Sequence, residues 1–244
     1  MSDARISAIA QQLADARRQG RRAVLNDQPC DLEEAFAVQD EVVRLLGDPV
    51  RGWKVIELPT GQVIFAPLLK SGDVPASAPW KVAGPEPAGI ELEIAFKLAR
   101  DVPRDANPEQ ILECIGAAHV VFELCQSRNA NPEDLPRHVT LADCILNNGV
   151  CLGATFADWR RKDLKGVAGR LFVDGKPHAD GRSGDPIRAM TVLAPAMAAR
   201  GKALKAGDVV ITGSLIGMHW LTGRHQLRGE IDGCGTVEMN LEAA

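Results

Sequence analysis

Two glutamates stand two residues apart inside an apolar run, in the stretch GIELEIAF at 89–96. Successive side chains of a β-strand point to opposite faces, so Glu91 and Glu93 would share one face, roughly 6 to 7 Å apart at their roots. Small residues, Gly89 and Ala95, flank them on that face, and no basic residue does. Adjacent like charges are unfavourable unless a proton or a cation lies between them. The spacing therefore predicts a site for a hard divalent cation.

The same alternation also fits a commoner arrangement, a half-buried strand whose polar face contacts water. A solvated strand face usually mixes in Lys, Thr or Arg, and none of these stands among Gly89, Glu91, Glu93 and Ala95. The stretch alone leaves both interpretations open.

Composition narrows the class of protein. The chain has 244 residues, of which 45% are hydrophobic and 25% charged, as expected of a globular protein with a sizeable core. A net charge of -4 and a pI near 5.8 do not indicate the excess of basic residues that is typical of nucleic-acid-binding proteins. The one dense basic cluster, RRQGRR at 17–22, follows an amphipathic helix and is interpreted as a solvated helix end.

Targeting signals and cysteine usage indicate a cytoplasmic protein. Asp3 and Arg5 interrupt the start of the chain, which lacks the apolar core of a signal peptide, and no apolar run approaches the roughly 18 residues of a membrane span. The six cysteines show no CxxC pairing. Free, mostly buried thiols are therefore expected rather than disulfides or a zinc site.

The first fifty residues have a helical pattern. Apolar residues recur at helical spacing from Ile6 to Leu13, and a second helix is predicted after Asp31, with Glu34 completing a capping box and Gly47 ending the helix. Later helices are predicted at 107–118 and 185–201. The first is capped by Asn107, and the second is capped by Asp185 and kinked at Pro195.

Strand patterns occupy most of the remaining chain. They are predicted on both sides of the turn at 59–61, at 89–99, at 120–124, in a hairpin turning at Asp174-Gly175, at 207–214 and twice within 229–241. This mixture indicates an α+β chain, and no dinucleotide-binding glycine motif, P-loop or nucleophile elbow is present. We expect one domain, 1–244, in which a helical segment, 1–50, packs on a β-rich remainder, 51–244.

Five segments occur in the order and spacing of one known family. They read GWKV, GIELEIAFKLARDVP, VVFELCQSR, LADCILNNGVCLG and LKAGDVVITGSL. Across nearly its whole length the chain resembles the hydratase and decarboxylase branch of the fumarylacetoacetate hydrolase superfamily, which includes 2-oxopent-4-enoate hydratase and 4-oxalocrotonate decarboxylase. The resemblance implies a mixed, rolled β-sheet core with helices outside it, usually in a homo-oligomer.

The resemblance also implies a Mg²⁺ or Mn²⁺ ion held by Glu91, Glu93 and a third carboxylate from a neighbouring strand. Gln126 stands where the family usually has that third ligand as Asp, so weakened metal binding is expected. Glu123 is expected on the opposite strand face from Gln126 and unable to replace it. Lys54 matches a lysine near the substrate and is the candidate for proton transfer, whereas its residue type alone favours an exposed strand lysine.

Two further residues match pocket positions of the family. Asn147 falls where a pocket serine is expected, within a segment at 144–147 that departs from the family's small polar run. Ser214 lies in a turn where the family presents hydroxyl and backbone groups, although an ordinary turn serine fits as well. Of the five histidines, only His219 lies close enough in sequence to Ser214 to be watched as a pocket residue.

The function implied is a metal-dependent hydro-lyase acting on a 2-hydroxydienoate or 2-oxo-enoate in aromatic-compound breakdown. A 2-oxo acid can chelate such an ion through its ketone and carboxylate oxygens, and an enolate is common to water addition and decarboxylation. A 2-oxo diacid decarboxylase and an acylpyruvate hydrolase therefore stay open. So does an inactive binding subunit that pairs with a related decarboxylase. No nucleic-acid or membrane partner is expected.

Overall fold

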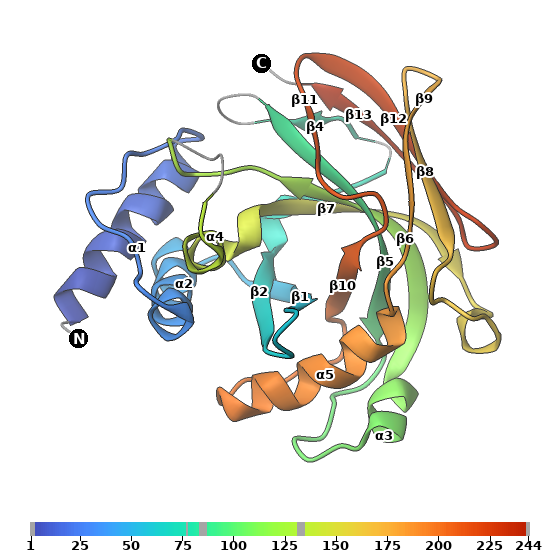
Figure 1. Cartoon of the computed structure of the whole chain (residues 1–244), viewed down its shortest axis with the longest axis horizontal. Coiled ribbons are helices and arrows are strands. Elements are labelled where there is room, and N and C mark those ends of the chain that lie inside the picture. The colour runs from blue at the N-terminus through green and yellow to red at the C-terminus, as the bar shows by residue number, and fades with distance from the viewer. Residues whose placement is uncertain (1–2, 77, 83–86, 131–134, 243–244) are drawn as a thin grey trace.

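The computed structural model describes residues 3–76, 78–82, 87–130 and 135–242. Two curved sheets form its centre (Figure 1). Helices α1, α2 and α4 lie to one side of the sheets, and α5 lies below β1 and β2 in this view. This mixed, rolled arrangement with peripheral helices confirms the α+β fold expected from the sequence.

The larger sheet runs in the order β2-β1-β10-β5-β6-β7-β3, and β11 adds to β5. Strand β1 pairs parallel with β10, whereas the pairs from β10 through β5 and β6 to β7 are antiparallel. The strands of this sheet are β1 (Val50–Glu57), β2 (Val63–Leu69), β3 (Asp73–Val74), β5 (Ala88–Leu98), β6 (Ile115–Cys125), β7 (Asn147–Phe156), β10 (Val209–Ser214) and β11 (His219–Leu221).

The smaller sheet runs in the order β4-β13-β12-β8-β9 and lies at the upper right of Figure 1. Its strands are β4 (Trp80–Lys81), β8 (Ala168–Val173), β9 (Lys176–Arg182), β12 (Arg224–Ile231) and β13 (Gly235–Glu242). The helices are α1 (Asp3–Arg18), α2 (Leu32–Leu46), α3 (Pro108–Glu113), α4 (Arg137–Ala142) and α5 (Pro186–Ala199), with short 3-10 turns η1 (Lys70–Gly72), η2 (Cys144–Leu146) and η3 (Trp159–Arg161). No helix within these described residues is long and apolar enough to cross a membrane.

The helix caps follow the sequence signals. Asn107 and Gln110 form a complete capping box, Asp185 accepts a hydrogen bond from the Arg188 backbone, and Gly47 ends α2 in the left-handed region at φ 65°. The helix predicted over 107–118 is shorter than expected. It ends at Glu113, because residues from Ile115 onward pair with β5 as a strand.

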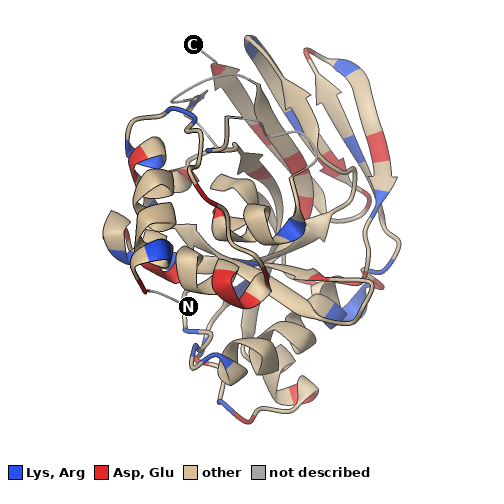
Figure 2. Ribbon diagram, turned by 60° about the vertical axis from the view of Figure 1, so that its left-hand side comes forward, with Lys and Arg blue, Asp and Glu red and all other residues tan. Residues whose placement is uncertain are grey.

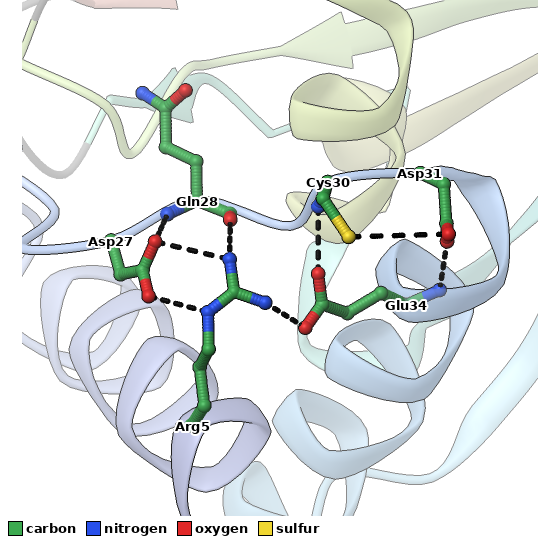
Figure 3. A network of polar contacts seen from close by, with 6 residues as sticks. All are labelled: Arg5, Asp27, Gln28, Cys30, Asp31 and Glu34. Carbon is green, nitrogen blue, oxygen red and sulfur yellow. Dashed lines mark hydrogen bonds and ion pairs between the residues drawn. The ribbon is translucent and has the colours of Figure 1, made fainter. Parts of the chain in front are cut away.

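A polar network joins the two N-terminal helices (Figure 3). The Arg5 guanidinium on α1 donates to the carboxylates of Asp27 and Glu34, and Glu34 also accepts from the Cys30 backbone N–H. Asp31 caps α2 by accepting from the Glu34 backbone N–H. The Glu34 side chain accepts from the backbone N–H of Cys30 and not from that of Asp31. The predicted capping box therefore forms only in part.

The main core joins helices to both sheets. It includes Ile9 and Leu13 of α1, Phe36 of α2 and Phe65 of β2 in one cluster of buried apolar residues. The rings of Phe36 and Phe65 lie 5.0 Å apart. All six cysteines are free, and only Cys30 is exposed, as the sequence indicated.

Candidate metal and catalytic site

The two glutamates of β5 face a third glutamate on β6. In the antiparallel pair, Glu91 lies directly opposite Glu123, and Glu93 lies opposite Val121. Directly opposite residues of a sheet share a face, so all three carboxylates lie on one face. The expectation that Glu123 points away from the site is wrong. Gln126 lies beyond the end of β6, so the alternation of faces along the strand does not extend to it.

Lys54 of β1 reaches these carboxylates from across the sheet. Its Nζ lies 3.0 Å from Glu91 Oε2 and 2.6 Å from Glu123 Oε2. The residue is 4% exposed, so it is a buried lysine and not the exposed strand lysine that its residue type favours. The parallel register of β1 with β10 aligns Lys54 with Ile211, which in turn lies opposite Ala95 of β5 on the glutamate face.

The electrostatics of the cluster are strongly coupled. Burial would lower the pKa of Lys54, but the carboxylates of Glu123 and Glu91 raise it well above its ordinary value. Burial raises the pKa of Glu123, with Glu91 and Glu93 adding to the shift. In contrast, burial at Glu91 is outweighed by the Lys54 ammonium together with side-chain hydrogen bonds to Glu123, Lys54 and Cys125, so the pKa of the Glu91 carboxyl is lowered. Two of the three acids therefore hold protons more tightly than in water, which is expected where a cluster lacks enough positive charge.

Glu93 is the member of the cluster with spare acceptor capacity. The Gly213 backbone N–H donates to its Oε2 at 2.6 Å, whereas its Oε1 is buried and has no hydrogen-bond partner among the described residues. Burial, with the charge of Glu91, raises the pKa of Glu93 to about 7. A buried, orphaned carboxylate oxygen is costly unless a cation or proton satisfies it. Three glutamates against one lysine therefore fit a divalent cation bound through oxygen ligands.

A thiol also lies at the cluster. The Sγ of Cys125 and carboxylate oxygens of Glu91 and Glu123 lie within 4.8 Å of one another, and the thiol lies 3.8 Å from Glu91 Oε2. Sequence reasoning missed both Glu123 and Cys125. The available signal was the period-two spacing of Val121, Glu123 and Cys125 on one strand face.

Asn147, predicted as a pocket residue, does meet the carboxylates. Its side-chain Nδ2 donates to Glu123 Oε1 at 2.9 Å. It follows three consecutive non-glycine residues with left-handed backbones, Cys144, Ile145 and Leu146, at φ 51°, 50° and 63°. Such conformations are uncommon outside glycine and concentrate where the surrounding structure enforces them. The strained turn at 144–146 therefore sets the start of β7 against the site.

Ser214 lies beside the site, but its hydroxyl serves the turn. Its register partner is Glu93, while its Oγ donates to the Gly217 carbonyl at 3.0 Å. The group that reaches Glu93 from this turn is the Gly213 N–H. His219 lies opposite Ile90, on the apolar face of β5, and its Nε2 contacts the Ile216 carbonyl. His219 therefore does not join the carboxylates.

Gln126 lies just beyond the end of β6, next to Cys125. Its backbone N–H donates to the Leu146 carbonyl at 2.9 Å. Its side chain is 4% exposed and lines a small cavity with Arg17 and Arg128.

Acidic and basic residues are mixed over the helices and outer strands in Figure 2.

Comparison with known proteins adds a family and a set of relatives. Residues 66–242 match the model of the fumarylacetoacetate (FAA) hydrolase C-terminal family. The chain is 28% identical over 254 residues to a 2-keto-4-pentenoate hydratase of Burkholderia vietnamiensis, covering 96% of this chain and 97% of that protein. It is 27% identical over 173 residues to a 2-hydroxyhexa-2,4-dienoate hydratase of Comamonas testosteroni, covering 67% and 64% of the two chains.

Solved structures share the fold. The structure of 4-oxalocrotonate decarboxylase from Pseudomonas putida G7, complexed with magnesium and adipate, matches with a TM-score of 0.86 and 18% identity over 100% of this chain and 99% of that chain. A fumarylpyruvate hydrolase from Pseudomonas aeruginosa, in complex with Mn²⁺ and pyruvate, matches with a TM-score of 0.61 and 16% identity over 81% and 91% of the two chains. At these identities the likeness shows the fold alone.

Proposed function

Because the chain belongs to the fumarylacetoacetate hydrolase family, we propose that it is a divalent-metal-dependent hydratase that adds water to a 2-hydroxydienoate or 2-oxo-enoate. The hydratase relatives support this choice, since one aligns over almost the full length of both chains. The decarboxylase likeness is one of fold. The observation that supports a metal-dependent site best is that Glu91, Glu93 and Glu123 share one face of the sheet, where Lys54 pairs with two of them, Glu91 and Glu123.

We assign the ion, Mg²⁺ or Mn²⁺, to Glu91, Glu93 and Glu123, with Gln126 outside the ligand set. The three carboxylates come from adjacent strands and share one face, and the orphaned Oε1 of Glu93 supplies an acceptor that needs a cation. When bound, the ion would act as a Lewis acid that holds and polarises a 2-oxo acid through its ketone and carboxylate oxygens.

Lys54 is the proposed proton carrier. Its Nζ is buried and already holds a proton between Glu91 and Glu123, so it can pass that proton to a substrate carbon without access to bulk water. Asn147 acts as a positioning residue, because its Nδ2 fixes one oxygen of Glu123. The Gly213 N–H likewise fixes Glu93, which leaves the other oxygen of that carboxylate for the ion.

We place this activity in the breakdown of aromatic compounds, in the cytoplasm, in a homo-oligomer. A 2-oxo diacid decarboxylase and an acylpyruvate hydrolase would use the same polarised ketone, and the fold likeness to the decarboxylase makes it the nearer rival. An inactive subunit that pairs with a related decarboxylase stays a further hypothesis. That hypothesis rests on Gln126 in place of the family's Asp and on the altered segment at 144–148, and a third ligand at Glu123 would remove the first of these two reasons.

The test is product analysis with the metal-loaded protein. Chelator-stripped enzyme is reloaded with Mn²⁺ and supplied separately with 2-hydroxypenta-2,4-dienoate and with a 2-oxo diacid, and products are identified by mass spectrometry. Gain of one water by the dienoate, absent without metal and absent in Lys54→Met, is the expected result. Loss of carbon dioxide from the diacid with no hydration would establish the decarboxylase instead. Metal binding without turnover of either substrate would overturn the hydratase assignment.

A further inference from the structure

A small cavity lies between the end of α1 and the segment that follows β6. It has a volume of about 50 Å³ and is lined by Ala16, Arg17, Gly20, Arg21, Gln126, Ser127, Arg128 and Asn148. A volume of this size holds a few water molecules or one small ion. Three of the lining residues are arginines, and none is acidic. The basic cluster interpreted from sequence as a solvated helix end therefore contributes to an enclosed space.

The buried charges around the cavity do not balance. Arg128 is 3% exposed and pairs with Asp143. Arg17 is half-buried and forms no ion pair with any carboxylate in the described part of the chain; its Nη1 donates to the Asn147 carbonyl at 3.0 Å. Of these two guanidinium groups, only that of Arg128 has a carboxylate partner among the described residues. Burial, with the nearby charge of Arg128, lowers the pKa of Arg17 to about 10, so the surroundings disfavour its charge unless an anion is added.

Arg128 also has unused donor capacity. Its Nε donates to Asp143 Oδ1, and its Nη2 donates to the carbonyls of Asp143 and Asn147. Its Nη1 is buried and has no hydrogen-bond partner among the described residues. An unpaired buried guanidinium nitrogen is expensive, and an oxyanion such as phosphate, which accepts several N–H hydrogen bonds, is a partner that fits a guanidinium well.

We propose that this cavity is a binding site for a small inorganic oxyanion of the phosphate type, held by Arg17 and Arg128, with Arg21 at its exposed side. Ser127 and Asn148 also line it. The site differs from the metal site in charge and in residues. It stands on observations independent of the proposed hydratase activity.

The anion site has a structural connection to the carboxylates. Arg17 and Arg128 both donate to the Asn147 carbonyl, and the Asn147 side chain donates to Glu123. An anion that fixes the two arginines would therefore fix Asn147 and tie α1 to the start of β7. Bound anion is therefore expected to stabilise the contact between α1 and the start of β7.

The test measures phosphate binding to chelator-stripped protein, so that phosphate cannot act through a metal ion. Equilibrium dialysis with radiolabelled phosphate gives the stoichiometry, and thermal unfolding at constant ionic strength gives the stabilisation. We expect one phosphate per chain. The melting temperature should rise roughly 5–10 °C once phosphate exceeds its dissociation constant about a hundredfold.

Two variants separate the cavity from general charge effects. Arg17→Gln should abolish saturable phosphate binding, whereas Arg18→Gln removes the same charge from an arginine 44% exposed on the same helix end and should leave it intact. Equal phosphate effects in both variants would overturn the proposal. The absence of phosphate binding to the wild type would overturn it as well. If the wild type binds no phosphate and Arg17→Gln dissociates an oligomer, the arginines pair with a carboxylate of a neighbouring subunit instead.

Discussion

At the scale of single residues, Lys54 and a divalent cation compete for the same oxygens. The ammonium lies within 3.0 Å of Glu91 and 2.6 Å of Glu123, the two carboxylates that we assign to the ion. In the absence of an ion, Lys54 supplies the positive charge that lets these acids stay buried. With the ion bound, that charge is no longer needed for stability, and the lysine is freed for proton transfer.

Replacing Lys54 should therefore destabilise the metal-free protein far more than the metal-loaded one. For Lys54→Met we expect a loss of about 3–5 kcal/mol in the free energy of unfolding without metal, because Glu91 and Glu123 lose the cation that pairs with both of them. Most of the loss should disappear with saturating Mn²⁺. Urea unfolding with and without Mn²⁺ measures both values, and Lys97→Met, an exposed lysine of the same sheet, is the control. A loss unchanged by Mn²⁺ would disprove the competition.

Metal affinity should depend on pH through Glu93, whose pKa is raised to about 7 by burial and Glu91. A raised pKa means that the folded, metal-free protein binds this proton tightly, so the proton opposes the ion below neutral pH and not above it. We expect Mn²⁺ affinity to fall roughly fivefold from pH 7 to pH 6 and to level off above pH 8. Calorimetric titrations across this range provide the measurement, and an affinity constant over the range would contradict the assignment.

The sequence predicted only part of this site. The pair Glu91 and Glu93 is predictable from its spacing along the chain. Lys54 and Asn147 are predictable from their match to positions of the family. Glu123 was missed because its place depends on the register of β6 against β5, which no local pattern fixes. The left-handed turn at 144–146 was not predicted either, since its three side chains favour no such backbone.

At the scale of elements, the pairing of β1 with β10 brings Lys54 to the glutamate sheet. The two strands pass closely at Gly52, where an added Cβ would lie 1.9 Å from the Val209 carbonyl oxygen. Local patterns placed most elements correctly, including the Asp174-Gly175 hairpin. They failed where pairing overrode helix propensity, at the end of α3.

Gly52→Ala should separate β1 from β10 and displace Lys54. We expect destabilisation of roughly 2–4 kcal/mol and loss of hydration activity, because backbone on both sides has to move. The matched control is Gly184→Ala, where an added Cβ meets nothing within 4 Å and the change should be nearly neutral. Thermal unfolding of both variants checks the difference. Similar stabilities for the two would show that this close approach is unimportant.

At the scale of the whole molecule, the N-terminal helices share the main core with the sheets. Ile9, Leu13 and Phe36 belong to the same buried cluster as Phe65 and Phe122. A separate small cluster lies on the glutamate side of the larger sheet: Leu68, Ala95, Val121, Val150, Val209 and Ile211. Packing of this kind favours one cooperative unit over a detachable helical segment.

The chain should therefore unfold in a single transition. We expect the calorimetric and van't Hoff enthalpies of the subunit to agree, and proteolysis within 1–50 to begin only as the sheets unfold. Scanning calorimetry with limited proteolysis measures both. An earlier, separate transition of the N-terminal helices would contradict the one-domain prediction.

The central claim is that Glu91, Glu93 and Glu123 bind a divalent ion that presents open sites to a 2-oxo acid. Calorimetric titration of chelator-stripped protein with Mn²⁺, with and without oxalate as a mimic of the 2-oxo-carboxylate group, tests it most directly. Wild type and Gln126→Ala should bind one ion, more tightly with oxalate, whereas Glu123→Gln should lose about a hundredfold or more in affinity. Unchanged binding in Glu123→Gln, or its loss in Gln126→Ala, would contradict the account.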